Sequence, residues 1–171
     1  MIVVILIGLF LGCRSNKKVH TELYKITAPP NDWDFVESGG ADYAWYHSKI
    51  GGTIYVDSNC SSQFEDRPLQ NSIQSLLAGV GSGPVQMTSL LLDGREALFA
   101  KTLGNLDGVE VEIGMFVMSK NQCLYDFVYI APQENFQRGL QDFNGTVYSF
   151  TSKMNTDALP NIKAPKEQVS E

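Results

Sequence analysis

The chain has 171 residues, of which 43% are hydrophobic and 19% are charged, an ordinary composition for one globular domain with a buried core. Its formal net charge is −6. Because an acidic protein repels phosphate backbones, this charge disfavours nucleic acid as a partner.

The N-terminus begins with an unbroken apolar run, residues 2–12, that is followed by a cysteine. The run is too short to cross a bilayer, which takes about 20 residues, but it has the length of a signal-peptide hydrophobic region. The segment LFLGC, residues 9–13, resembles the lipobox of bacterial lipoproteins, with Phe10 in place of the usual leucine. The resemblance implies that residues 1–12 are a signal peptide and that Cys13 becomes the acylated first residue. The alternative is a buried N-terminal strand with an ordinary cysteine.

We therefore expect an exported protein whose partner at the N-terminus is membrane lipid, reached through acylated Cys13. Its expected location is the periplasmic or outer surface of the outer membrane. Residues 13–24 would form a polar tether between this anchor and the domain. Arg14, Lys17 and Lys18 in the tether could contact anionic lipid head groups or could simply form a solubilising linker.

The first predicted elements of the domain are a β-hairpin and a helix. Strand-forming residues on both sides of Gly51-Gly52 predict a hairpin over residues 43–57. Pro68 suits the first position of a helix, which the glycine-rich residues 79–83 then end. The apolar face of this helix comprises Leu69, Ile73, Leu76 and Leu77.

A run of strands joined by tight turns follows, and a second helix closes the domain. The strands are predicted over residues 87–92, 95–103, 109–117 and 123–130, with turns at Asp93-Gly94, 104–108 and 119–122. Pro132 then suits the start of the second amphipathic helix. Its apolar stripe comprises Phe136, Leu140, Phe143, Val147 and Phe150.

This order of elements predicts an α+β fold, in which an antiparallel β-sheet meander packs with two amphipathic helices. The folded domain is expected over residues 25–152. Residues 153–171 are polar and contain two prolines, which predicts a disordered C-terminal tail.

The pattern resembles the PsbP-like fold family, which also includes a Ran-binding protein, over about residues 25–152. The resemblance rests on the element order, on the hairpin LLDGREA at residues 91–97, and on CLYDF at residues 123–127 followed by Phe136, Phe143 and Ser149-Phe150. It implies a PsbP-like sandwich and an assembly or binding module rather than an enzyme. The manganese-cluster and Ran-binding roles of the family find no supporting motif in this sequence.

Cys60 and Cys123 are the cysteines that remain once Cys13 is acylated. Each lies where a predicted strand meets a loop, and an exported protein enters an oxidising compartment, so the two could form a disulfide. Two buried thiols are the alternative. No metal or other cofactor is predicted, because no histidine lies near either cysteine in the sequence.

No catalytic residue is assigned from the sequence. His47 is the single histidine of the predicted domain, and a strand histidine of this kind is more typical of a structural role. Residues 79–83 follow a helix, whereas phosphate-binding loops follow a strand, so this glycine-rich stretch is predicted to be a connector. Glu110 and Glu112 share one strand face and are more typical of a solvated surface than of a cation site.

The adjacent residues Trp45, Tyr46 and His47 are the candidate partner or ligand surface, provided that they are exposed. The favoured function is a non-catalytic binding or assembly lipoprotein of the cell envelope, with an unidentified envelope protein as its partner. Two alternatives stay open. One is a small hydrolase that uses His47 with a carboxylate such as Asp42, and the other is a carrier of a small apolar ligand.

Overall fold

The computed structural model describes residues 22–61, 64 and 67–153 of the chain. The predicted signal peptide, Cys13 and the C-terminal tail beyond Lys153 lie outside these residues. The elements, in chain order, are β1 (Tyr24–Lys25), β2 (Asp34–Phe35), β3 (Tyr43–His47), β4 (Gly52–Cys60), α1 (Leu69–Leu77), β5 (Gln86–Leu92), β6 (Arg95–Leu106), β7 (Val109–Lys120), β8 (Cys123–Pro132), α2 (Phe136–Tyr148) and β9 (Thr151–Ser152).

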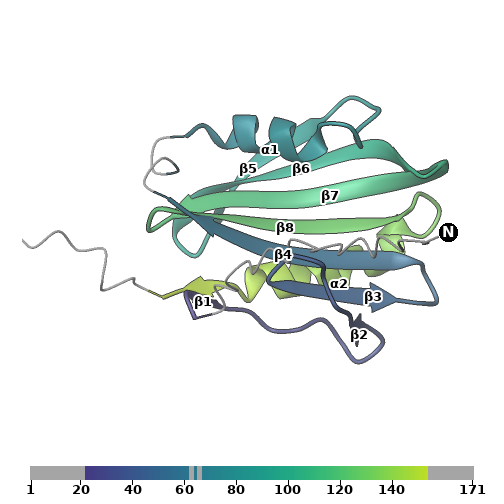
Figure 1. Cartoon of the computed structure of the whole chain (residues 1–171), viewed down its shortest axis with the longest axis horizontal. Coiled ribbons are helices and arrows are strands. Elements are labelled where there is room, and N and C mark those ends of the chain that lie inside the picture. The colour runs from purple at the N-terminus through teal and green to yellow at the C-terminus, as the bar shows by residue number, and fades with distance from the viewer. Residues whose placement is uncertain (1–21, 62–63, 65–66, 154–171) are drawn as a thin grey trace, which may run out of the picture.

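A seven-stranded antiparallel sheet forms the centre of the molecule, with the strand order β2-β3-β4-β8-β7-β6-β5 (Figure 1). Strands β5 to β8 form the predicted meander, and β4 joins it by pairing with β8. The short strands β1 and β9 form a separate two-stranded sheet. The predicted α+β fold of an antiparallel sheet with two helices is confirmed.

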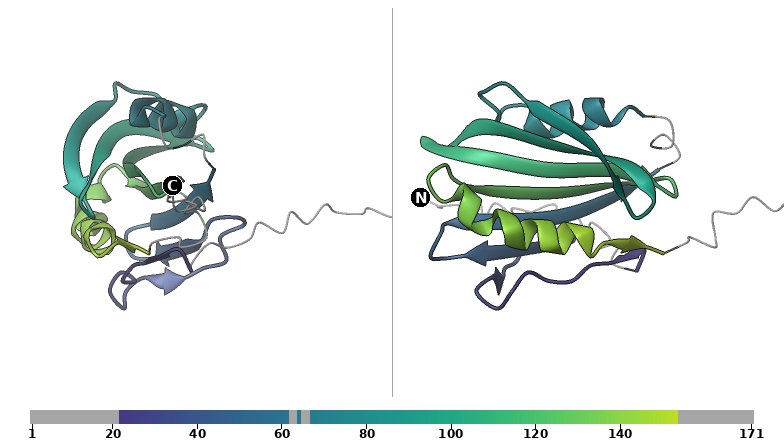
Figure 2. Two further views of the ribbon diagram at one scale, coloured as in Figure 1. Left: turned by 90° about the vertical axis from the view of Figure 1, so that its left-hand side faces the viewer. Right: turned by 180° about the vertical axis from the view of Figure 1, so that it is seen from behind.

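The two helices lie on opposite faces of the sheet, as the end-on view in Figure 2 shows. α1 packs on β6 and β7, whereas α2 packs on β8, β4 and β7. Side chains along a strand alternate between the faces, so Tyr125 and Phe127 of β8 belong to the α2 side while Leu124 and Val128 belong to the α1 side. None of the helices in the described part of the chain has the length and apolarity needed to cross a membrane.

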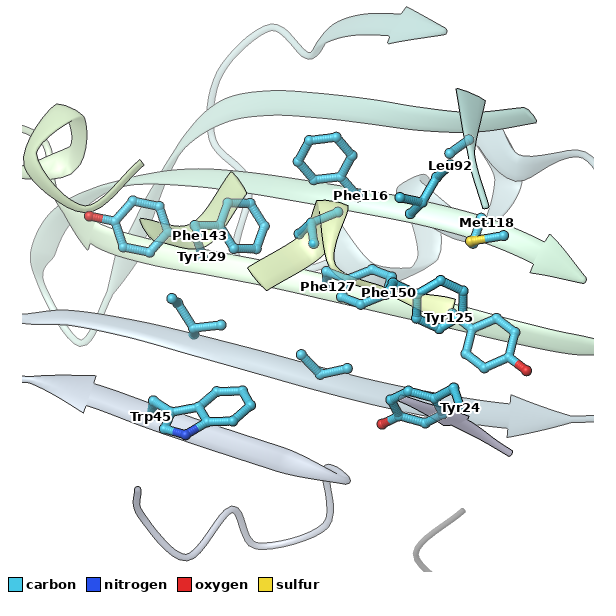
Figure 3. Packing of buried hydrophobic residues seen from close by; sticks show 14 of the residues in the cluster. Tyr24, Trp45, Leu92, Phe116, Met118, Tyr125, Phe127, Tyr129, Phe143 and Phe150 are labelled. Atoms are coloured by element: carbon cyan, nitrogen blue, oxygen red, sulfur yellow. The ribbon is translucent and has the colours of Figure 1, made fainter. Parts of the chain in front are cut away.

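Aromatic side chains form most of the core on the α2 side (Figure 3). Phe136, Phe143 and Val147 of the predicted helical stripe are fully buried. The ring of Phe136 stacks on Tyr129 with centroids 4.8 Å apart, and Phe143 meets Phe116 at 5.6 Å. On the α1 side, Ile73 and Leu77 are buried as predicted, but Leu76 is exposed.

The domain begins earlier than the predicted residue 25. Tyr24 is buried in the core, where its ring packs edge-on against Tyr125 at 5.5 Å. The Lys153 N–H donates to the Leu23 carbonyl at 2.7 Å and extends the pairing of β1 with β9. The ordered domain therefore extends slightly beyond the predicted residues 25–152 at both ends, into the predicted tether at Tyr24 and the predicted tail at Lys153. Both strands form by pairing between the two ends of the domain, which a local pattern does not reveal.

Three other predicted boundaries move because of tertiary contacts. Gly52 lies in β4 rather than in the hairpin turn. A β-carbon at this position would come within 3.0 Å of the Tyr129 ring, so the glycine serves close packing and not the turn. β6 continues through Gly104, where a β-carbon would lie 2.6 Å from the carbonyl oxygen of Val80 in the crossing connector. Pro132 ends β8, and α2 starts later, after Asn135.

Cys60 and Cys123 occupy opposite positions at the ends of β4 and β8, and the predicted disulfide joins them. The N–H of Ser61 donates to the carbonyl of Gln122, which makes Cys60–Cys123 a non-hydrogen-bonded pair, the closer of the two antiparallel pair types. This explains why their alpha-carbons are only 3.9 Å apart, closer than the separation of about 4.4–6.8 Å usual for a disulfide.

Candidate functional site

Trp45, Tyr46 and His47 do not form the continuous surface that was predicted. Trp45 is only 5% exposed and its ring stacks on Tyr43 with centroids 5.5 Å apart. His47 is also buried and meets the Trp33 ring edge-on at 5.2 Å. Only Tyr46 is accessible, at 39% exposure. Alternation along β3 places Trp45 and His47 on the α2 side, so their part in the predicted surface is wrong.

His47 and Asp42 do not form a catalytic pair. Asp42 directly precedes β3 and His47 is its last residue, so roughly 16 Å of extended chain separates them. Asp42 instead accepts hydrogen bonds from the hydroxyl groups of Tyr24, at 2.9 Å, and Ser58, at 2.5 Å. Burial raises the pKa of Tyr24, and the charge of Asp42 raises it further. The carboxylate of Asp42 therefore serves as a structural acceptor, and the predicted pairing with His47 is wrong.

The accessible side of the sheet lies opposite α2, on strands β3, β4 and β8. α1 packs over β6 and β7, so within the described residues this half of the face has no covering helix (Figures 1 and 2). We call it the open face. Its residues are Tyr46, Thr53, Tyr55, Asp57, Asp126, Val128 and Ile130.

Tyr55, Val128 and Ile130 form an apolar centre of the open face, which we call its floor. Polar side chains, Thr53 at one end and Asp57 with Asp126 at the other, flank it. Tyr46 is paired with Thr53, and Tyr55 with Val128. Tyr55, Val128 and Ile130 are half-buried, and Ile130 and Val128 continue into the core under α1. Tyrosine combines an apolar ring with a hydroxyl group, a combination that is common at binding surfaces.

Two carboxylates meet on the open face. Asp57 of β4 is registered directly opposite Asp126 of β8, and both side chains are half-buried. Like charges at directly opposite positions of an antiparallel pair destabilise the pair. Two carboxylates on neighbouring strands also attract a cationic group.

The open face ends where the chain returns toward α1. The carbonyl of Phe64 accepts a hydrogen bond from the Ser119 hydroxyl at 2.6 Å, and Phe64 is buried in the α1-side core. Phe64 therefore closes the face at the end of the sheet that carries the disulfide. Tyr46 forms its edge on β3, so the open face extends from Tyr46 to the carboxylate pair.

The remaining predicted features have structural roles. The glycine-rich residues 79–83 connect α1 to β5, and Glu112 forms an ion pair with Lys101 at 2.6 Å.

No group of three or more metal-binding side chains occurs among the described residues. Three surface hollows of about 450, 400 and 320 Å³ are each lined by at least one charged side chain, Arg67, Asp142 and Glu110 respectively.

Sequence reasoning found Tyr46 but missed the rest of the open face. The signal that could have found it is the alternation of Tyr55 and Asp57 with buried Ile54 and Val56 along β4. That alternation identifies two faces, but it does not show which one a helix covers. The pairing of Asp57 with Asp126 depends on the register between β4 and β8, two strands that are far apart in the sequence.

Solved structures share this fold, although no family model and no curated protein sequence matches the chain. A protein from Bacteroides thetaiotaomicron has a TM-score of 0.59 and 7% identity over 78% of this chain, which spans only 46% of that protein. The cyanobacterial PsbP protein CyanoP from Synechocystis has a TM-score of 0.54 and 13% identity, with 85% of this chain and 100% of CyanoP covered.

LpqN of Mycobacterium tuberculosis, a protein involved in cell envelope biogenesis, is also similar. Its TM-score is 0.50 and its identity 15%, with 75% of this chain and 83% of LpqN covered. At these identities the likeness concerns the fold alone. Together with the seven-stranded sheet and its two helices, it establishes that the chain has a PsbP-like α+β fold.

Proposed function

We propose that this protein is a lipid-anchored, non-catalytic binding module of the bacterial cell envelope, and that its open face receives the partner. The open face carries the proposal, because it combines the exposed Tyr46, an apolar floor and a carboxylate pair. The likeness to LpqN, which is involved in cell envelope biogenesis, supports an envelope location.

The chemistry of the open face defines the partner that fits it. Tyr46, Tyr55 and Val128 offer apolar contact, and Asp57 with Asp126 offers a site for a positive charge. A segment of an envelope protein that carries an apolar residue beside a lysine or arginine satisfies both requirements.

Photocrosslinking at the two exposed tyrosines tests this surface. A photoreactive amino acid replaces Tyr46 on the open face in one variant, and Tyr148 on α2, at the opposite face of the sheet, in the matched control. Irradiated cells should yield an adduct of defined mass from position 46 only. The adduct should disappear when Asp57→Asn and Asp126→Asn are added. Adducts of equal yield at both positions, or at neither, would contradict the proposal.

The anchor is tested separately by Cys13→Ala. The substitution removes the acyl acceptor, and stable anchoring generally requires more than one acyl chain, so the variant should leave the membrane fraction while remaining folded. Membrane fractionation followed by a salt wash measures the effect. A variant that stays with the membrane after the wash would show that the apolar run is an uncleaved anchor.

A further inference from the structure

Within the described part of the chain, strand β5 is an uncovered edge of the seven-stranded sheet. It pairs with β6 on one side and forms the end of the strand order. Only Leu92 of its seven residues is buried, and Leu91 is 75% exposed. A strand in this position presents a row of unpaired backbone N–H and C=O groups, which can pair with another strand.

β5 lacks the features by which edge strands usually avoid such pairing. Its sequence, QMTSLLL, contains no charged residue and no proline within residues 86–92. The opposite edge differs, because β2 has only two residues and one of them is Asp34. The two edges of the sheet are therefore protected to different degrees.

We infer that β5 pairs with β5 of a second copy of this chain, antiparallel and with a two-fold axis at Ser89. Ser89 is the central residue of the strand, so each copy presents the same pattern to the other. Met87 of one copy meets Leu91 of the other on the α1 side, and Thr88 meets Leu90 on the α2 side. The two sheets then continue as one.

The charges near β5 permit this self-association. The chain as a whole carries a net charge of −6, but β6 places Arg95, Glu96 and Lys101 opposite β5. Together with Asp93 in the adjoining turn, these residues give two positive and two negative charges, so this edge has no acidic excess that would repel a second copy. Because β5 has no charged side chain, it offers no ion pair to a charged peptide. A second copy of β5, in contrast, places an apolar residue opposite an apolar residue, Met87 opposite Leu91. This inference is independent of the proposed function of the open face.

Disulfide trapping with Ser89→Cys in the full chain tests the register of the pair. Ser89 is exposed, and its hydroxyl donates a hydrogen bond to the Glu96 carboxylate at the surface, so the variant should fold. Across the two-fold axis the two new thiols face one another. Mild oxidation of membranes should therefore give a reducible dimer with twice the mass of the monomer in the same sample.

Leu91→Cys is the matched control, since Leu91 lies on the same face and is more exposed. In the proposed register the two copies of residue 91 are four positions apart, about 13 Å, beyond the reach of a disulfide. This variant should give at least tenfold less dimer. Absence of dimer from Ser89→Cys, or equal dimer from Leu91→Cys, would overturn the inference.

Met87→Lys in the Ser89→Cys background supplies a second measurement. Met87 is exposed, so a lysine should leave the fold unchanged, and circular dichroism checks this. The two-fold axis brings two added charges to the paired edge, and the yield of dimer should fall at least tenfold. An unchanged yield would show that the copies meet through another surface and would overturn the inference.

Discussion

The two faces of the sheet are covered to different extents. On the α2 side, Phe127, Phe143 and Phe150 lie within an aromatic cluster that α2, β1 and the chain before β2 close from solvent (Figure 3). On the other side, α1 buries the β6–β7 half, while Tyr46 and Tyr55 on the β3–β4–β8 half stay accessible or half-buried.

The difference separates residues that hold the fold together from residues that are available to a partner. Removing a buried ring loses its transfer free energy and leaves a cavity, whereas removing an exposed ring loses little. Equivalent substitutions on the two faces should therefore have very different effects on the free energy of unfolding.

The largest loss is expected for Phe143→Ala. Phe143 is fully buried between α2 and the sheet, and truncating a buried phenylalanine typically costs about 3–5 kcal/mol. Tyr148→Ala is the matched control, because Tyr148 belongs to the same helix but is 60% exposed. Its cost should stay within about 0.5 kcal/mol. Urea unfolding measures both, and equal losses would contradict the distinction between the buried core on the α2 side and the exposed surface.

The disulfide should contribute almost as much. Cys60 and Cys123 are separated by 63 positions in the sequence, and the entropy of closing such a loop corresponds to roughly 4 kcal/mol. Replacing both cysteines with serine should lower the free energy of unfolding by up to this amount. Unfolding with and without reductant gives an independent measurement on the unmodified chain. A loss below about 1 kcal/mol would mean that the paired strands hold their register without the bond.

Asp93 joins three elements that are distant in the sequence. It occupies the turn between β5 and β6 with a φ of 48°. Its carboxylate accepts hydrogen bonds from the Lys120 ammonium at 2.7 Å and from the backbone N–H and hydroxyl of Ser152 at 2.9 and 2.7 Å. Burial alone would raise the pKa of Asp93, but the hydrogen bonds from Lys120 and Ser152 outweigh it and lower the pKa.

Asp93→Asn should cost about 1–3 kcal/mol at neutral pH, because hydrogen bonds to a charged group are lost. A carboxylate whose pKa is lowered by folding stabilises the protein above its unfolded pKa, and this contribution disappears as the pH falls through the folded pKa. The difference in stability between the Asp93→Asn variant and the unmodified chain should therefore shrink as the pH falls below about 4, the ordinary pKa of an aspartate, toward the lower pKa of Asp93 in the folded protein. Urea unfolding across this range measures it, and a constant difference would show that the charge is not responsible.

Local sequence patterns predicted the two helices and the strands β3 to β8, but not the short strands β1, β2 and β9, nor how the elements are covered. The alternation in β3 placed Trp45 and His47 on one face and Tyr46 on the other. It did not show that Trp33 and α2 bury the first face, because those contacts come from segments outside the strand. Tyr24 was missed for the same reason, since its partners are Tyr125 and Phe150.

The PsbP-like resemblance predicted the fold, since the order of strands and helices carries that information. It did not predict the open face, because the pairing of Asp57 with Asp126 depends on a register between strands that a helix and a three-strand meander separate in the sequence. The predicted lipidation of Cys13 has a purely local signal, which lies outside the described residues.

The free energy of unfolding of the combined Asp57→Asn and Asp126→Asn variant tests most directly whether the open face serves binding rather than stability. Both substitutions keep side-chain size, and together they remove the two like charges that face each other across β4 and β8. Like charges at directly opposite positions repel each other, and cross-strand pairs are worth roughly 0.2–1 kcal/mol. Urea unfolding should show a variant as stable as the unmodified chain, or more stable by up to this amount. A loss of more than about 1 kcal/mol would contradict the account, because the two carboxylates would then be part of what holds the domain together.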